Sequence, residues 1–273
     1  MTLSSGFRGL HNSSELLVLP NPWDLGSAMM FKALGYKALA TTSLGFAFSL
    51  GQVEGGVSID QMLQQAVEIQ TLTGLPVTVD LENGGADSPE GVAKAITRCV
   101  EAGLAGASIE DFSGNMDQPI YEFSLAVERI QAAAEAAHKL DPDFILTARS
   151  ENFSYNRPDL DDTIKRLQAF EKIGADVLYA PEVTDLGDLK ILCSSVKLPV
   201  NVVVGLRTEG FTTQNLIAAG VRRVSLGSTL ARAAYGAAID ALQQNLKSGS
   251  FELSEAAMDY ASIDQLLKSG NMS

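Results

Sequence analysis

The chain has 273 residues, of which 46% are hydrophobic and 19% charged, and its formal net charge is −13. This composition predicts a globular protein with a sizeable core, and the acidic balance disfavours nucleic acid and anionic membranes as partners. No apolar run reaches the roughly 18 residues of a membrane-spanning helix, and residues 1–12 lack the apolar core of a secretion signal. We therefore expect a cytoplasmic protein in which Cys99 and Cys193, both in predicted helices, are buried free thiols.

Eight short apolar runs alternate with eight helix-like stretches, which predicts a (β/α)8 barrel. We expect one domain over residues 1–273, with a helical tail from about residue 247. A doubly wound open sheet is the alternative, but no GxGxxG follows the first run. The expected strands are 16–20, 37–41, 76–81, 106–110, 143–148, 176–180, 199–203 and 222–226. The expected helices are 24–34, 58–73, 88–102, 122–140, 159–173, 185–196, 211–219 and 228–246.

Charged residues stand where several expected strands end. Asp80 and Glu82 stand two residues apart at the end of one strand, and Glu110 ends the next. The carboxyl ends of barrel strands meet at one mouth, so these three oxygen donors predict a site for Mg²⁺ or Mn²⁺. Surface acids in loops are the alternative reading. Asp111 is a weaker candidate, because neighbouring strand residues point in opposite directions.

Arg149 ends the fifth expected strand and is followed closely by Glu151. A guanidinium binds a substrate carboxylate through two parallel hydrogen bonds, although a structural pair with Glu151 or Glu110 is also open. Glu151 either anchors Arg149 or accepts a proton.

Other features narrow the chemistry. His11 and His138 do not end strands, no lysine does, and no nucleophile elbow, P-loop or CxxC is present. Metal-assisted chemistry on a small anionic oxyacid remains. Gly45 and Gly51 bound an aromatic stretch that either lines an anion pocket with backbone N–H groups or is only a tight turn packed by Phe46 and Phe48. Gly84-Gly85 and Ser113-Gly114 mark flexible loops, one of them a candidate lid.

Several strings in chain order resemble the isocitrate lyase/phosphoenolpyruvate mutase superfamily, from about Leu16 to Leu242. They are NPWDLGSAMMFKALGYKALATTSLGFAFSLG, VDLENGG, GASIED, ARSENF, GADVLYAPEVTDL and PVNVVVG. The resemblance implies a (β/α)8 barrel whose last helix is exchanged with a neighbour, in a homotetramer built as a dimer of dimers.

The resemblance also implies roles for single residues. Mg²⁺ would bind chiefly through Asp80, with Glu82 and Glu110 acting through water, and Glu54 would lie near the metal. Arg149 matches the substrate-binding arginine of the family. The segment that holds the substrate carboxylate and oxo group corresponds to Thr42, Ser43 and Leu44.

The stretch after the fourth strand departs from that pattern. It reads EDFSGNMDQPIYEF, without the cysteine, lysines and histidine of the lid that isocitrate and methylisocitrate lyases carry. Asn115 is the one candidate for the lid asparagine of the mutase branch, and Pro181 stands where that branch has a histidine. We therefore expect a Mg²⁺-dependent lyase that cleaves a C–C bond of a small 2-oxo or 2-hydroxy dicarboxylate through an enolate, oxaloacetate decarboxylation being the simplest version. The alternatives are phosphonopyruvate C–P chemistry and a non-catalytic 2-oxo acid binder.

Overall fold

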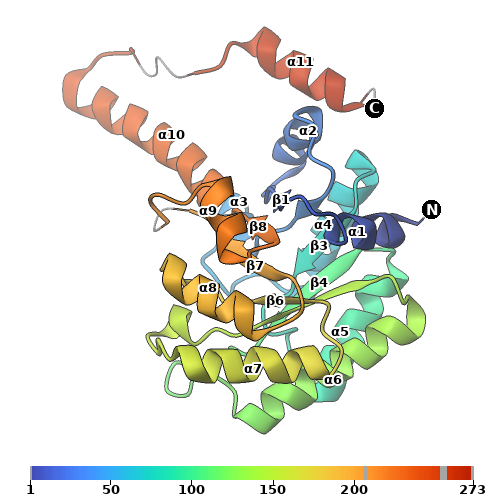
Figure 1. The fold of residues 1–273 in the computed structure, drawn as a ribbon. Coiled ribbons are helices and arrows are strands. Elements are labelled where there is room, and N and C mark those ends of the chain that lie inside the picture. The colour runs from blue at the N-terminus through green and yellow to red at the C-terminus, as the bar shows by residue number, and fades with distance from the viewer. Residues whose placement is uncertain (1, 206–207, 253–256, 272–273) are drawn as a thin grey trace.

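A computed structural model describes residues 2–205, 208–252 and 257–271 and forms a nearly closed parallel barrel (Figure 1). The strands are hydrogen-bonded in the order β1-β8-β7-β6-β5-β4-β3-β2, and the backbone N–H of Ala40 donates to the Pro20 carbonyl across the remaining gap at 3.2 Å. The expected fold class is therefore confirmed. The strands are β1 (Leu17–Leu19), β2 (Leu39–Ala40), β3 (Val77–Asp80), β4 (Gly106–Glu110), β5 (Ile145–Arg149), β6 (Val177–Tyr179), β7 (Val200–Val203) and β8 (Arg223–Ser225).

All eight expected helices form, with ends within two residues of those expected. Short polar side chains cap them: Ser58 accepts the N–H of Gln61, and Ser88 precedes Pro89 in the first turn. These helices are α2 (Leu25–Ala33), α4 (Ile59–Thr73), α5 (Pro89–Glu101), α6 (Phe123–Leu140), α7 (Leu160–Lys172), α8 (Leu186–Ser195), α9 (Thr213–Ala219) and α10 (Thr229–Ser248). The tail contributes α11 (Tyr260–Asn271), and a 3-10 turn, η1 (Phe153–Tyr155), follows β5.

Helix α3 (Ser43–Ser49) corrects the reading of the aromatic stretch after β2 as a tight turn. The Thr42 hydroxyl caps the helix by accepting the N–H of Gly45 at 3.2 Å. A Cβ at Gly45 would meet the Thr42 methyl at 2.7 Å, so this turn of the helix requires glycine. Capping and burial of Ala47 thus outweigh the poor helix propensities of glycine and phenylalanine.

A further helix that the pattern did not predict, α1 (Leu3–His11), covers the base of the barrel, opposite the carboxyl ends of the strands. Phe7 is fully buried in a core cluster with Leu19 and Ile145. His11 donates from Nδ1 to the Phe7 carbonyl at 2.9 Å, and its Nε2 lies 3.3 Å from a guanidinium nitrogen of the buried Arg223. Since arginine can only donate, Nε2 is the acceptor and His11 is neutral.

We expect the stability of this base to fall in weak acid. Burial and the charge of Arg223 lower the pKa of His11 from 6.5 to about 4. The unfolded chain therefore takes up a proton that the folded chain refuses between these two values, so the free energy of unfolding decreases as pH falls from 6.5 to 4. Above pH 6.5 His11 is neutral in both states and adds no pH dependence. Urea unfolding at pH 7.5, 6 and 5 should show a smaller decline in His11→Gln than in the wild type; equal declines would contradict this account.

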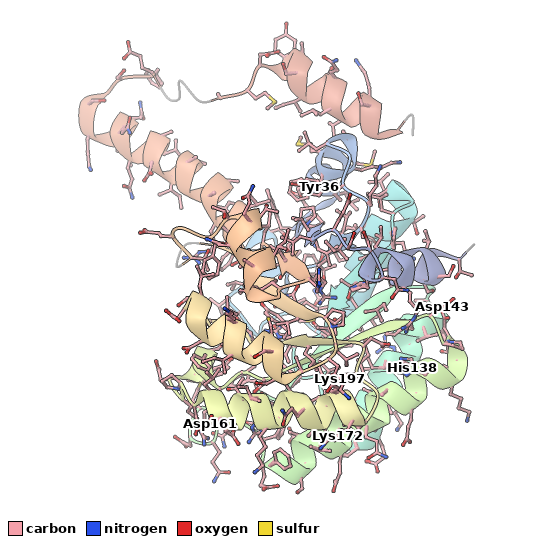
Figure 2. All side chains as sticks on the ribbon, viewed as in Figure 1. Tyr36, His138, Asp143, Asp161, Lys172 and Lys197 are labelled. Carbon is pink, nitrogen blue, oxygen red and sulfur yellow. The ribbon has the colours of Figure 1, made fainter. Side chains whose placement is uncertain are left out.

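The C-terminal helices extend away from the barrel in Figures 1 and 2. Helix α11 packs against α2, with the backbone of Gly270 close to the carbonyl of Met29. In α10, by contrast, Leu242 and Leu246 are 58% and 84% exposed. Within the described part of the chain, no helix is long and apolar enough to cross a membrane.

Candidate active site

Three neighbouring strands bring the predicted charges together at the mouth of the barrel. Glu110 on β4 is in register with Arg149 on β5, and Asp80 ends the adjacent β3. The guanidinium of Arg149 binds Asp80 Oδ1 through Nη1 at 2.9 Å, Glu110 Oε2 through Nη2 at 3.0 Å and Glu151 Oε1 through Nε at 2.8 Å. Arg149 is thus held by both carboxylates that the sequence offered as partners and by Asp80 as well.

Asp80 is the centre of a second set of contacts. Its Oδ2 accepts the Ser43 hydroxyl at 3.1 Å, and its Oδ1 accepts the Ser108 hydroxyl at 3.2 Å. The backbone N–H of Asp80 donates to the Thr41 hydroxyl at 2.8 Å. The strand-end carboxylate is therefore fixed by the two neighbouring strands. It also touches the start of α3, the segment that the resemblance assigns to substrate.

The site has more carboxyl groups than arginine side chains, because Arg149 alone is bound by three carboxylates. Burial, followed by the charge of Asp80, raises the pKa of Glu82 to about 7 and raises the pKa of Glu54. Burial raises the pKa of Glu110, which is 5% exposed, well above its ordinary value against the opposing charge of Arg149. Glu82 also adopts a left-handed backbone with φ of 52°, a conformation that costs a non-glycine residue about 1 kcal/mol or more. Crowded carboxylates of this kind are stabilised by an added cation.

The donor set suits a hard divalent cation bound mainly through one carboxylate. Among the residues that the structure describes, no three His, Cys, Asp or Glu side chains are grouped tightly enough to hold an ion directly. Asp80, Glu82 and Glu110 supply only oxygen donors, and Mg²⁺ typically binds one or two carboxylates and keeps several waters. The oxygen donors of Asp80, Glu82 and Glu110 therefore fit a hard divalent cation such as Mg²⁺.

Glu82 and Glu110 open onto a cavity of about 1200 Å³, whereas Asp80 is not among the residues that line it. Six predicted site residues line it: Ser43, Glu54, Glu82, Glu110, Arg149 and Glu151. Of the segment Thr42–Leu44, Ser43 lines the cavity, whereas the Thr42 hydroxyl is used as the cap of α3. His11 lies in α1 and His138, which is labelled in Figure 2, lies in α6 and binds Asp176 at 2.9 Å, so neither histidine ends a strand, as expected.

A short hairpin over residues 112–121 borders the cavity and corresponds to the expected lid after β4. Its arms pair at Phe112 and Ile120, and the Ser113 N–H donates to the Pro119 carbonyl at 2.8 Å. The Asn115 side chain accepts the N–H of Asp117 at 2.9 Å and so stabilises the turn of the hairpin. Phe112 stacks on Tyr155 of η1, with ring centroids 4.0 Å apart, and both line the cavity.

Among the residues that sequence reasoning missed, Ser108 and Tyr179 contact the charged side chains of the site. Ser108, which binds Asp80, lies two positions before Glu110 on the same strand face, and this alternation could have revealed it. The Tyr179 ring lies 5.0 Å from the guanidinium of Arg149 and supports it from β6. No local signal marks Tyr179, because its partner is 30 residues away in the sequence.

A family model, curated relatives and a solved structure all match this chain over most of its length. Residues 7–246 match the family model described as phosphoenolpyruvate phosphomutase. The chain is 30% identical over 225 residues to the 2-methylisocitrate lyase of Escherichia coli strain K12, covering 79% of this chain and 75% of that protein. It is 27% identical over 277 residues to the oxaloacetate decarboxylase of Chromohalobacter salexigens, covering 96% and 93%. A crystal structure from Burkholderia cenocepacia J2315 is 45% identical, with a TM-score of 0.92 and coverage of 96% and 94%.

Proposed function

Because the chain belongs to the phosphoenolpyruvate phosphomutase family, which includes carbon–carbon lyases, we propose that it is a Mg²⁺-dependent lyase acting on a small 2-oxo or 2-hydroxy dicarboxylate. The observation that carries the proposal is the guanidinium of Arg149, which three carboxylates orient at the mouth of the barrel. This arrangement supplies one fixed cation for a substrate oxyanion and oxygen donors for a metal.

The proposed mechanism for oxaloacetate needs few protein groups. When bound at Asp80, Mg²⁺ supplies Lewis-acid stabilisation of the negative charge that develops on the oxo oxygen. Arg149 would hold a substrate carboxylate, and its positive charge would also stabilise the developing enolate. The C3–C4 bond breaks, its electron pair passes into the enolate, and CO₂ leaves. Solvent then protonates C3 to give pyruvate, so this reaction requires no general acid on the lid.

Retro-aldol cleavage of a 2-hydroxy acid would require a base for the hydroxyl proton. Glu54 lines the cavity, and burial raises its pKa, which makes it a stronger base than an ordinary carboxylate. Glu151 is committed to Arg149 Nε at 2.8 Å, so Glu54 is the better candidate of the two. The hairpin 112–121 carries no cysteine, lysine or histidine, which favours decarboxylation over cleavage of isocitrate or 2-methylisocitrate.

The test is pyruvate release from oxaloacetate with Mg²⁺ and with chelator, each against the uncatalysed rate. We expect release well above background with Mg²⁺ and loss of the excess with chelator. Mg²⁺-dependent phosphonopyruvate turnover in place of oxaloacetate turnover would point to C–P chemistry. Calorimetric binding of oxalate without turnover of any substrate in the panel would point to a 2-oxo acid binder.

We also propose that the exposed face of α10 is covered by a second copy of the chain in a homo-oligomer, with the tetramer as the expected size. Leu242→Asp should dissociate the assembly, because burying an unpaired carboxylate in an apolar interface is costly. Light scattering coupled to gel filtration measures this, with Gln243→Asp on the same helix as the matched control. A monomeric wild type, or dissociation by both variants alike, would contradict an interface at Leu242.

A further inference from the structure

A buried ion pair lies directly behind the proposed site. Asp111 follows Glu110 but points away from the mouth, and it is 1% exposed. Its Oδ2 accepts Nη1 of Arg166 on α7 at 3.2 Å, and its Oδ1 accepts the backbone N–H of Glu151 at 2.7 Å. The sequence offered Asp111 as a weaker candidate for a metal ligand. In the structure it lies on the opposite strand face from Glu110 and pairs with Arg166 instead.

Arg166 extends these contacts to two further parts of the site. Its Nη1 donates to the Tyr121 carbonyl at 3.1 Å, where the hairpin 112–121 ends. Its Nε donates to Asp162 Oδ2 at 2.7 Å, and the same oxygen accepts Nδ2 of Asn152 at 3.0 Å. Arg166 is thus linked to Glu151 by way of Asp111 and to Asn152 by way of Asp162. It contacts the hairpin directly.

The chain of contacts ends at Arg149. The backbone of Glu151 is held by Asp111, and the carboxylate of Glu151 accepts Arg149 Nε at 2.8 Å. The hairpin both begins beside Asp111 and returns to it, since the Tyr121 N–H donates to the Asp111 carbonyl at 2.9 Å. A shift of Asp111 would therefore turn the guanidinium and tilt the hairpin together.

A contribution to the stability of the fold does not by itself explain why Asp111 and Arg166 form a buried ion pair. Burying two charges costs about as much as their attraction returns, and apolar replacements are often neutral or stabilising. Such a pair does fix the orientation of its two side chains, because a guanidinium and a carboxylate bind each other through several directional hydrogen bonds. The contacts of Asp111 and Arg166 converge on the groups whose orientation the proposed reaction needs.

We propose that Asp111 and Arg166 are positioning residues that orient Glu151, and through it Arg149, together with the base of the hairpin 112–121. The inference rests on the proposed function, in which Arg149 stabilises a developing enolate. Neither residue contacts the substrate, so their removal should leave binding of the ground state nearly intact. The loss should fall on the transition state, where misplacement by about 1 Å costs on the order of 100-fold.

The test compares Asp111→Asn and Arg166→Met with the wild type. Asparagine keeps an acceptor for the Glu151 N–H but removes the charge that holds Arg166. We expect kcat for oxaloacetate to fall about 10- to 100-fold with little change in KM. The affinity for oxalate with Mg²⁺, measured by calorimetry, should fall in parallel, because planar oxalate resembles the enolate rather than the substrate. The double variant should lose no more kcat than the worse single variant, since the two residues act as a unit.

The matched control is Arg8→Met, which breaks another arginine–aspartate pair, Arg8–Asp176 at 2.8 Å, at the base of the barrel. It should lower the thermal midpoint and leave kcat and oxalate affinity unchanged. If Arg166→Met fails to fold, Arg166→Lys keeps the charge but lacks the fork, and it should show the same loss of kcat. Thermal destabilisation of the Asp111 and Arg166 variants with unchanged kcat and oxalate affinity would overturn the positioning role.

The two proposals fail differently. A wild type that binds oxalate but turns over no oxaloacetate would overturn the proposed reaction, while the oxalate affinities of the variants would still decide the positioning role. A wild type that binds no oxalate would overturn both.

Discussion

Replacing Asp80 by alanine is expected to abolish Mg²⁺-dependent binding of oxalate and to lower oxaloacetate turnover by at least about 1000-fold. Lewis-acid stabilisation is worth several kcal/mol, and each 1.4 kcal/mol corresponds to a factor of ten. The fold should persist, because Arg149 keeps Glu110 and Glu151 as partners. Removing one of several crowded carboxylates should even raise the thermal midpoint of the metal-free protein, as a site strained for function is relieved.

Calorimetry with oxalate, with and without Mg²⁺, measures the binding, and differential scanning measures the thermal midpoint. Asp60→Ala is a suitable control, because it also breaks an aspartate–arginine pair, with Arg98 at 2.6 Å, but on the exposed surface of α4. That variant should bind and turn over like the wild type. Undiminished Mg²⁺-dependent binding in Asp80→Ala would remove the metal from this position.

The residues at the strand ends were predictable because two features coincide there: a nearly continuous apolar run ends, and a charged residue follows it. A parallel strand that is buried on both faces is a nearly continuous apolar run, so a charge at its end is conspicuous in the sequence. Glu110 and Arg149 stand out in this way, and β4 and β5 then place them in register. Glu82 illustrates the limit of strand alternation: its left-handed backbone shows that the chain has already left β3 when it reaches this residue.

Residues that act over long sequence distances were not predictable. Arg166 reads as an ordinary helix residue that pairs with Asp162 four positions earlier, and only the packing of α7 against β5 brings it to Asp111. Helix α1 was missed for a similar reason. Its nine residues are too few to form a stable helix in isolation, and burial of Phe7 in the base of the barrel stabilises it.

The second large effect is expected at Arg149, where lysine should not substitute for arginine. The guanidinium donates to three carboxylates in three directions at once, whereas an ammonium is a point charge without this planar fork. We expect Arg149→Lys to lower kcat/KM for oxaloacetate by about 100-fold or more, because a 1 Å displacement of a positioned group already costs roughly that factor. Oxalate affinity should fall as well, since Arg149 is proposed to hold the substrate carboxylate.

Arg149→Met removes the charge altogether and separates the electrostatic role from the geometric one. The pKa of Glu110, already raised by burial, should rise further when its guanidinium partner is lost. The folded variant then binds more protons than the unfolded chain near neutral pH, so its free energy of unfolding should increase as pH falls from 8 to 5.5. In the wild type the guanidinium offsets the charge of these carboxylates, so its free energy of unfolding should increase less over the same pH range. Urea unfolding at both pH values measures the difference. An Arg149→Met variant with wild-type pH dependence would mean that the carboxylates at the mouth are relieved by something other than Arg149.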